Sequence, residues 1–358
     1  MTTTLDPRPR STGAVAEGAI DRPEAVAAAT VPRHAARFPI LILYPHARCN
    51  CRCTMCDIWQ VTTRDEIDPA AVAAEAGRWR ALGVERVVLS GGEPLMHRDL
   101  WALAAPLADA GIAITLLSTG LLLKRHVAGI ARYVDDVVVS LDGPPAIHDA
   151  IRRVPGACAK LTEGVAAVRA AAPRTAVSAR CTVQRANCAD LRATVRSARS
   201  MGLDRISFLA ADVSSEAFNR PGGWPEDRRR AVAPGPDELR RLRVELDRLY
   251  VEHAADFASG FVAESPDKLE KRLYAYFAAL LGLGEFPGVT CNAPWVSAVV
   301  EADGTVRPCF FHAPIGRWSG GEPLADVIGG AAAVAFRAGL DVATNPVCRR
   351  CVCSLNLV

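Results

Sequence analysis

Three cysteines near residue 50 have a spacing that suits an iron–sulfur cluster. Cys49, Cys53 and Cys56 form the pattern C-x3-C-x2-C in a chain of 358 residues and twelve cysteines. Three thiolates on a four-iron cluster leave one iron open to another ligand, whereas four thiolates close the cluster for electron transfer. A zinc site is the alternative, but zinc sites usually combine one C-x2-C pair with a second pair farther along the chain. Cys51 lies off the spacing, and we interpret it as a bystander.

The cysteine stretch follows the first of six short apolar runs that alternate with helical patterns. This alternation predicts a parallel sheet, because right-handed crossovers connect parallel neighbours. Six units are two fewer than a closed eightfold barrel has, so the predicted fold is α/β, a partial (β/α)6 TIM-like barrel. The predicted strands are Phe38–Tyr44, Glu85–Ser90, Ala113–Ser118, Asp135–Leu141, Thr175–Gln184 and Arg205–Ala210, and the predicted helices are Pro69–Leu82, Asp99–Ala110, Leu121–Tyr133, Ala157–Ala171 and Ala189–Met201.

The barrel is predicted to occupy residues 38–215, with different sequence patterns on either side. Residues 1–37 are rich in Ala, Pro, Thr and Arg, and are predicted to be a disordered leader. Residues 216–288 contain proline–glycine breaks and two helical patterns, which predict a helical connector. A hairpin of Val296–Ala302 and Thr305–Phe311 around Asp303-Gly304 predicts a small α+β subdomain over residues 289–358.

Polar residues follow the first three predicted strands, at the ends where barrels of this type gather their chemistry. The cysteine trio follows the first strand, Gly91-Gly92-Glu93-Pro94 the second, and Ser118-Thr119-Gly120 the third. This combination resembles the radical S-adenosylmethionine (radical SAM) enzymes, and Ser140-Leu141-Asp142-Gly143 with Arg152 downstream adds to the resemblance. One departure is Met55, where the family often has an aromatic residue.

The resemblance implies two cofactors at this end of the barrel. Cys49, Cys53 and Cys56 would hold a [4Fe-4S] cluster, and S-adenosylmethionine (SAM) would chelate its open iron. An electron from the cluster would then cleave SAM and release a 5′-deoxyadenosyl radical, while the protein supplies orientation.

The predicted SAM contacts combine the resemblance with residue type. Gly91 and Gly92 would let the backbone approach the ligand, and Glu93 would accept from its ammonium group. Arg180 would pair with the carboxylate, with a surface arginine as the alternative. The full predicted set is Gly91, Gly92, Glu93, Pro94, Ser118, Ser140, Asp142 and Arg180, in which loop capping is the alternative for the two serines.

The C-terminal cysteines resemble the Twitch subdomain, a short form of the SPASM domain. The resemblance implies one auxiliary [4Fe-4S] cluster on Cys291, Cys309, Cys348 and Cys351, and Cys353 could replace Cys351. A structural zinc site with four thiolates is the alternative.

Two isolated cysteines are candidate catalytic hydrogen-atom donors. Cys188 lies where a helix is predicted to begin, and a helix N-terminus lowers the pKa of a thiol. Cys181 alternates with Arg180 and Thr182 along a predicted strand, which also fits a small buried side chain facing the helices. A buried helix cysteine is the alternative for Cys188.

Twitch-bearing relatives act on aminocyclitols, sugars and peptides. The resemblance therefore implies hydrogen abstraction at a hydroxyl-bearing carbon of a small natural product, of the sugar or aminoglycoside type. Epimerisation would follow if a thiol returns hydrogen, and dehydrogenation if an electron passes to the auxiliary cluster. One alternative is a peptide-modifying maturase, although residues 1–37 are too short to form a leader-binding domain. The other alternative is a non-catalytic iron–sulfur redox sensor.

Composition limits the partners and the location. A formal charge of +3 is too small to argue for nucleic acid or an anionic membrane. No apolar run reaches about 18 residues, and no secretory signal pattern is present. We therefore expect a cytoplasmic protein, where clustered cysteines bind metal, with a small-molecule substrate and a reductase such as flavodoxin or ferredoxin.

Overall fold

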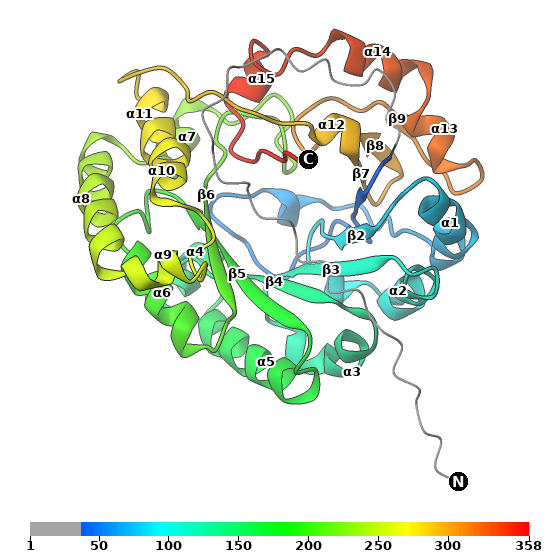
Figure 1. Ribbon diagram of the computed structural model, residues 1–358, viewed down its shortest axis with the longest axis horizontal. Coiled ribbons are helices and arrows are strands. Elements are labelled where there is room, and N and C mark those ends of the chain that lie inside the picture. Colours follow the sequence, from blue (N-terminus) through cyan, green and yellow to red (C-terminus); the bar gives the residue numbers. More distant parts are fainter. Residues whose placement is uncertain (1–36, 358) are drawn as a thin grey trace.

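The computed structural model describes residues 37–357, and all but the last residue of the predicted leader lies outside this range. One nine-stranded sheet runs through the described chain in the order β6-β5-β4-β3-β2-β1-β7-β8-β9. Helices cover its outer face, so that sheet and helices form an open, partial barrel (Figure 1). The strands are β1 (Ile40–Leu43), β2 (Arg86–Leu89), β3 (Ala113–Ser118), β4 (Asp136–Ser140), β5 (Ala176–Val183), β6 (Arg205–Ala210), β7 (Ser297–Val300), β8 (Thr305–Arg307) and β9 (Gly316–Arg317).

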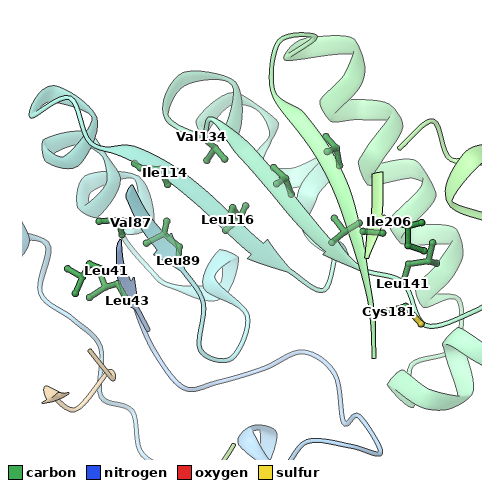
Figure 2. Close-up of a cluster of buried hydrophobic side chains, with 14 of the residues drawn as sticks. Leu41, Leu43, Val87, Leu89, Ile114, Leu116, Val134, Leu141, Cys181 and Ile206 are labelled. Atoms are coloured by element: carbon green, nitrogen blue, oxygen red, sulfur yellow. The ribbon is translucent and has the colours of Figure 1, made fainter. Parts of the chain in front are cut away.

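The six predicted strands are confirmed, and neighbours in sequence pair in parallel from β1 to β6. Their carboxyl ends therefore lie at the same edge of the sheet, where the predicted site residues follow them. Inward and outward positions alternate along each strand. The side chains of Leu41, Val87 and Ile114 face the helices and are fully buried (Figure 2).

The predicted C-terminal hairpin forms, and its first strand also joins the barrel sheet. β7 and β8 pair antiparallel, as predicted, but over two registered pairs only. β7 also pairs in parallel with β1 along its whole length, from Ile40↔Ser297 to Leu43↔Val300. The barrel sheet thus continues into the C-terminal region, because the apolar β1 would otherwise be left with an unpaired edge.

The five predicted barrel helices are confirmed, and further helices appear that the sequence pattern did not predict. The most important is α4, an eight-residue helix between β4 and α5. Helices of the barrel layer are α1 (Pro69–Ala81), α2 (Leu100–Asp109), α3 (Leu123–Tyr133), α4 (Pro145–Arg152), α5 (Ala157–Ala171) and α6 (Leu191–Ser200).

The predicted helical connector contains α8, whose leucines pack against the barrel, and a helix that begins after Ser265, whose side chain accepts from Lys268 N. No helix of residues 37–357 combines the length and apolar character needed to cross a membrane. The remaining helices are α7 (Glu226–Val232), α8 (Pro236–Glu252), α9 (Ala254–Ala258), α10 (Pro266–Leu269), the π-helix η3 (Glu270–Ala275), α11 (Tyr276–Leu280), α12 (Ala293–Val296), α13 (Leu324–Ile328), α14 (Ala331–Gly339) and α15 (Pro346–Arg349), with short 3-10 turns η1 (Ile58–Gln60) and η2 (Pro94–Met96).

Candidate active site

Residues 49–57, here called the cluster loop, are pinned between two segments far away in sequence. Arg52 N donates to Arg152 O (3.1 Å) and Thr54 N to Ile151 O (3.0 Å), so the end of α4 lies against the loop. At the other end of the loop, Asp57 N donates to Phe218 O at 3.3 Å. The three predicted ligand cysteines are thus held by α4 and by the segment that follows β6.

Gly91 and Gly92 allow a close backbone approach by the chain that enters the cluster loop, and their contact with SAM stays a prediction. A Cβ atom on Gly92 would lie 2.0 Å from Arg48 O, and Gly91 has a φ of +100°. The adjacent Glu93 N donates to Arg48 O at 2.9 Å. The glycine pair therefore lets the chain that enters the cluster loop lie directly on the end of β2.

The Glu93 carboxylate is fully buried and is occupied by protein donors. It accepts from Thr119 N (2.6 Å), Thr119 Oγ1 (2.7 Å), Ser118 Oγ (3.0 Å) and Leu95 N (3.2 Å). Burial raises its pKa, and these hydrogen bonds oppose the rise. Two residues predicted to contact SAM, Glu93 and Ser118, thus contact each other and tie the end of β2 to the end of β3.

A buried charged chain leads from β4 to the middle cysteine of the trio. Arg152 Nη2 lies 2.6 Å from Asp142 Oδ2, and Arg152 Nη1 donates to Cys53 Sγ at 3.5 Å. The other oxygen of Asp142 accepts from Thr182 N at 2.9 Å. A hydrogen bond from Cys51 and the charge of Arg152 lower the pKa of Cys53 to about 6. Asp142 therefore positions the guanidinium that stabilises this thiolate, and Cys51 contacts a ligand cysteine although it lies off the spacing.

The other two predicted ligands of the trio are protonated in the metal-free chain. Burial raises the pKa of Cys49 to about 12 and that of Cys56 to about 11. Iron ligation requires thiolates, so cluster binding must release these protons.

Buried polar atoms without a protein partner gather around the cluster loop. Asn50 Nδ2, Gln184 Nε2 and Arg152 Nε lack a hydrogen-bond partner within the described chain. The amide oxygen of Gln184 accepts from Thr54 Oγ1 at 2.8 Å, which orients its nitrogen. Buried donors normally find acceptors, and the inorganic sulfides of a cluster or the polar groups of SAM are acceptors. The residues around the cysteine trio therefore fit both groups.

The five C-terminal cysteines gather from three segments beside the strand-end face. The thiol of Cys291 is close enough to Cys309, Cys348 and Cys351 to raise the pKa of each, although burial is the larger cause for all three. Cys353 N donates to Cys351 Sγ at 3.3 Å. Over residues 37–357, no three His, Cys, Asp or Glu side chains lie close enough for a single metal ion. Iron–sulfur clusters are held by Cys thiolates, so a gathering of cysteines fits such a cluster.

Four half-buried aromatic rings, here called the aromatic cluster, connect segments that carry or adjoin the two cysteine sets. Tyr44 precedes the cluster loop and stacks on Phe310 with ring centroids 6.3 Å apart. Phe310 directly follows Cys309 and stacks on Phe218 at 6.4 Å, and Phe218 meets the edge of Phe311 at 5.9 Å. Sequence reasoning missed this contact and had no signal for it, because its members come from three distant segments.

The segment after β6 holds Phe218 in place. Phe218 and Asn219 both have positive φ values, 61° and 63°, which are unusual for residues other than glycine. Arg220 anchors the turn, since its buried guanidinium pairs with Asp212 at 2.6 Å and lies over the ring of Trp224. Asp212 thus has an internal partner, and backbone strain at Phe218 is balanced by these contacts.

Arg180 and Ser140 remain predictions as SAM contacts. Both lie on neighbouring strands at paired positions, Ser140↔Arg180. Arg180 Nε donates to Ser207 Oγ at 3.3 Å, and its side chain is exposed. Pro94 begins the turn η2, which fixes the chain after Glu93.

The two candidate hydrogen donors are buried in the hydrophobic core. Cys181 is fully buried beside Leu141 (Figure 2), and Asn187 Nδ2 donates to its sulfur at 3.6 Å. Cys188 Sγ lies 3.7 Å from Glu238 O on α8, and 2% of its surface is exposed. Burial raises the pKa of Cys188 to about 11, so the predicted lowering by a helix N-terminus is wrong. Their role as hydrogen donors stays a prediction, and the Arg152–Asp142 pair beside Cys53 is close enough to Cys181 to influence its pKa.

A partial barrel with one cysteine set at its strand ends and a second set beside them defines an iron–sulfur protein with two cluster sites. A family model described as the radical SAM superfamily matches residues 43–198, and one described as an iron–sulfur cluster-binding domain, SPASM, matches residues 291–352. The chain thus contains a radical SAM domain and a SPASM iron–sulfur cluster-binding domain. A SAM-binding [4Fe-4S] cluster and an auxiliary iron–sulfur cluster are its cofactors.

Known proteins are similar to this chain in sequence or in fold. The PqqA peptide cyclase of Ruegeria pomeroyi is 28% identical over 249 residues, which is 68% of this chain and 59% of that protein. The fold is similar to that of anSMEcpe with bound AdoMet, with 17% identity, a TM-score of 0.61, and 87% and 86% of the two chains covered. SuiB of Streptococcus suis bound to S-adenosylmethionine has 14% identity, a TM-score of 0.60, and coverage of 88% and 72%. The chain thus spans about three fifths of its curated relative's length.

Proposed function

We propose that the protein dehydrogenates a hydroxyl-bearing carbon of a small natural product, of the sugar or aminocyclitol type. The observation that carries this proposal is the aromatic cluster. Its rings join the end of β1, which enters the cluster loop, to the residue after Cys309. A substrate radical formed beside these rings would lie between an electron source and an electron acceptor.

The residues would act as holders and orienters of the two cofactors. Cys49, Cys53 and Cys56 would hold the SAM-binding cluster, and when bound, cluster and SAM supply a carbon-centred radical that takes a hydrogen atom from the substrate. Arg152 stabilises the Cys53 thiolate, while Asn50 and Gln184 offer free amide groups toward the same space. A one-electron donor such as flavodoxin or ferredoxin would reduce the cluster in the cytoplasm.

The auxiliary cluster would accept the electron that the substrate radical loses. We assign it to Cys291, Cys309, Cys348 and Cys351, as one Twitch-type cluster. Cys351 lies close enough to Cys291 and Cys309 for both to raise its pKa, which supports Cys351 as the fourth ligand. Cys353 is the substitute if Cys351 is absent.

Dehydrogenation is favoured over epimerisation because of where the thiols lie. Epimerisation needs a thiol that returns hydrogen to the substrate radical, and the candidate thiols Cys181 and Cys188 are only 0% and 2% exposed. Without such a donor, the radical loses an electron and a proton, which leaves a ketone.

The first test is release of 5′-deoxyadenosine by the reconstituted, reduced protein with SAM. Wild type and Cys51→Ala should both release it, and Cys53→Ala should release none, because only the second variant removes a ligand. Equal release from Cys53→Ala would contradict the assignment of the trio, and no release from any protein would support the redox sensor instead.

The second test separates the two outcomes in deuterated water with candidate aminocyclitols and sugars. Dehydrogenation gives a carbonyl product and deposits no carbon-bound deuterium, whereas inversion through an exchanged thiol deposits one. If wild type forms a deuterated epimer and Cys188→Ala or Cys181→Ala does not, dehydrogenation would be overturned. The substituted cysteine would then be the hydrogen donor.

A peptide-modifying enzyme is the second candidate. The similarity to PqqA peptide cyclase and the fold shared with SuiB bound to a precursor peptide favour it. Incubation with peptides encoded near the gene would distinguish the two candidates. A SAM-dependent change in peptide mass would identify a peptide as the substrate and overturn the small-molecule proposal.

A further inference from the structure

His312 contacts one of the auxiliary cysteines, a contact that the proposed function does not require. Its Nε2 atom lies 3.3 Å from Cys348 Sγ, a distance that fits an N–H···S hydrogen bond. The residue is 8% exposed, so little water competes for the contact. The two residues are 36 positions apart in the chain.

Both partners are held from behind. The imidazole ring packs edge-on against Phe336 of α14, with ring centroids 4.9 Å apart. Its own carbonyl accepts from Arg307 Nη1 at 3.2 Å, which fixes the backbone. On the other side, Cys348 N donates to Asn345 Oδ1 at 3.2 Å, in the cap of α15. The contact is therefore fixed by α14, by the cap of α15 and by the hydrogen bond from Arg307. Such support is unusual for two side chains that approach by accident.

The chemistry of the two atoms defines the direction of the hydrogen bond. A ligand thiolate can only accept, so Nε2 must carry the proton, whether the imidazole is neutral or charged. Hydrogen bonds to the sulfurs are among the factors that set the reduction potential of an iron–sulfur cluster. A donor stabilises the reduced, more negative cluster more than the oxidised one, and so raises the potential.

We propose that His312 is a positioning residue that raises the reduction potential of the auxiliary cluster through its hydrogen bond to Cys348. The higher potential makes that cluster a better acceptor for the substrate's electron. This purpose rests on the proposed dehydrogenation, but the hydrogen bond and its effect on the potential do not. His312 thus acts through the cysteine and does not contact substrate.

Redox titration of the reconstituted full-length protein, followed by electron paramagnetic resonance, tests the proposal without any substrate. The signal that changes when SAM is added belongs to the SAM-binding cluster and serves as an internal control. In His312→Phe, which keeps a ring against Phe336 but has no donor, the auxiliary signal should shift to lower potential. A tenfold change in the oxidised-to-reduced ratio corresponds to about 59 mV for one electron. The SAM-responsive signal should not move.

Two further variants separate the hydrogen bond from packing. His312→Gln retains an N–H donor and should recover part of the potential, whereas Phe336→Leu loosens the packing and keeps the donor, so it should shift the potential less than His312→Phe. An unchanged potential in His312→Phe would overturn the proposal. Loss of about four irons, the content of one [4Fe-4S] cluster, in that variant would also overturn it, because His312 would then be needed to bind the cluster. Absence of a ketone product with the shift present would reject only the dehydrogenation.

Discussion

At Gly92, a single added methyl group would collide with the chain that enters the cluster loop. A Cβ atom there would lie 2.0 Å from Arg48 O and 2.6 Å from Ala47 O, and backbone atoms cannot rotate away as side chains do. Gly77, in the middle of α1, has nothing within 4 Å of the same position. The two glycines therefore form a matched pair for substitution.

We expect Gly92→Ala to lose iron after reconstitution and to unfold at lower urea concentration. Gly77→Ala should keep its iron, and its free energy of unfolding should rise by up to about 1 kcal/mol, because alanine favours a helix. Iron analysis and urea denaturation of both variants check this. Full iron content in Gly92→Ala would show that the loop can move aside without cost.

Arg152 and Asp142 form a buried ion pair whose removal affects both stability and the thiolate. Arg152→Met should lower the free energy of unfolding of the metal-free protein by about 3–5 kcal/mol, because it leaves Asp142 buried without a partner. The double variant Asp142→Asn/Arg152→Met should recover part of that loss. Urea unfolding of the single and double variants measures the coupling, and additive losses would contradict it.

At the scale of elements, two neutral histidines connect loops to the ends of strands. His46 Nδ1 accepts from Arg48 N at 3.0 Å, and His148 Nδ1, in α4, accepts from Asp142 N at 3.1 Å. Burial lowers the pKa of each to about 4. Protonation of Nδ1 would break these hydrogen bonds, so the folded protein binds protons less readily than the unfolded chain.

The metal-free protein should therefore lose stability as pH falls from about 6.5, the pKa of an unfolded histidine, toward the folded value of about 4. In this window the unfolded histidines bind protons that the folded ones do not. Stability from this source is fully present at pH values above the unfolded pKa. The urea midpoint measured against pH should fall through the window, and His148→Gln should flatten the fall; an unchanged slope would assign the acid lability to other groups.

At the scale of the whole molecule, the SPASM region completes the sheet on which the SAM site is built. β7 lies beside β1, the strand that leads into the cluster loop. In the sequence, all the other barrel strands, β2 to β6, come between these two strands. Removal of residues 289–358 would expose the edge of β1 with its apolar side chains.

A truncated protein that ends at residue 288 should therefore aggregate and should not behave as an independent SAM-binding barrel. Light scattering and size-exclusion chromatography test this, and co-expression of residues 289–358 as a separate chain should restore some soluble material. A monomeric truncated protein that binds iron would show that the barrel folds alone.

The sequence was sufficient for features that depend on local pattern. Cysteine spacing identified the trio, and the period of apolar residues located β1 to β6 within a few residues, because both signals lie within one short segment. The motif Gly91-Gly92 correctly predicted a close backbone approach, and the structure shows that the chain entering the cluster loop makes one.

Only the tertiary structure decided which side chains meet. Arg152 reaches Cys53 across 99 positions, and His312 reaches Cys348 across 36. These contacts depend on the register of the sheet and on how loops pack over its edge, which local periodicity does not encode. For the same reason Glu93 is joined to Ser118, and Cys188 lies beneath α8. The sequence by itself therefore determined the class of chemistry, whereas packing between distant segments determined which residues are placed to perform it.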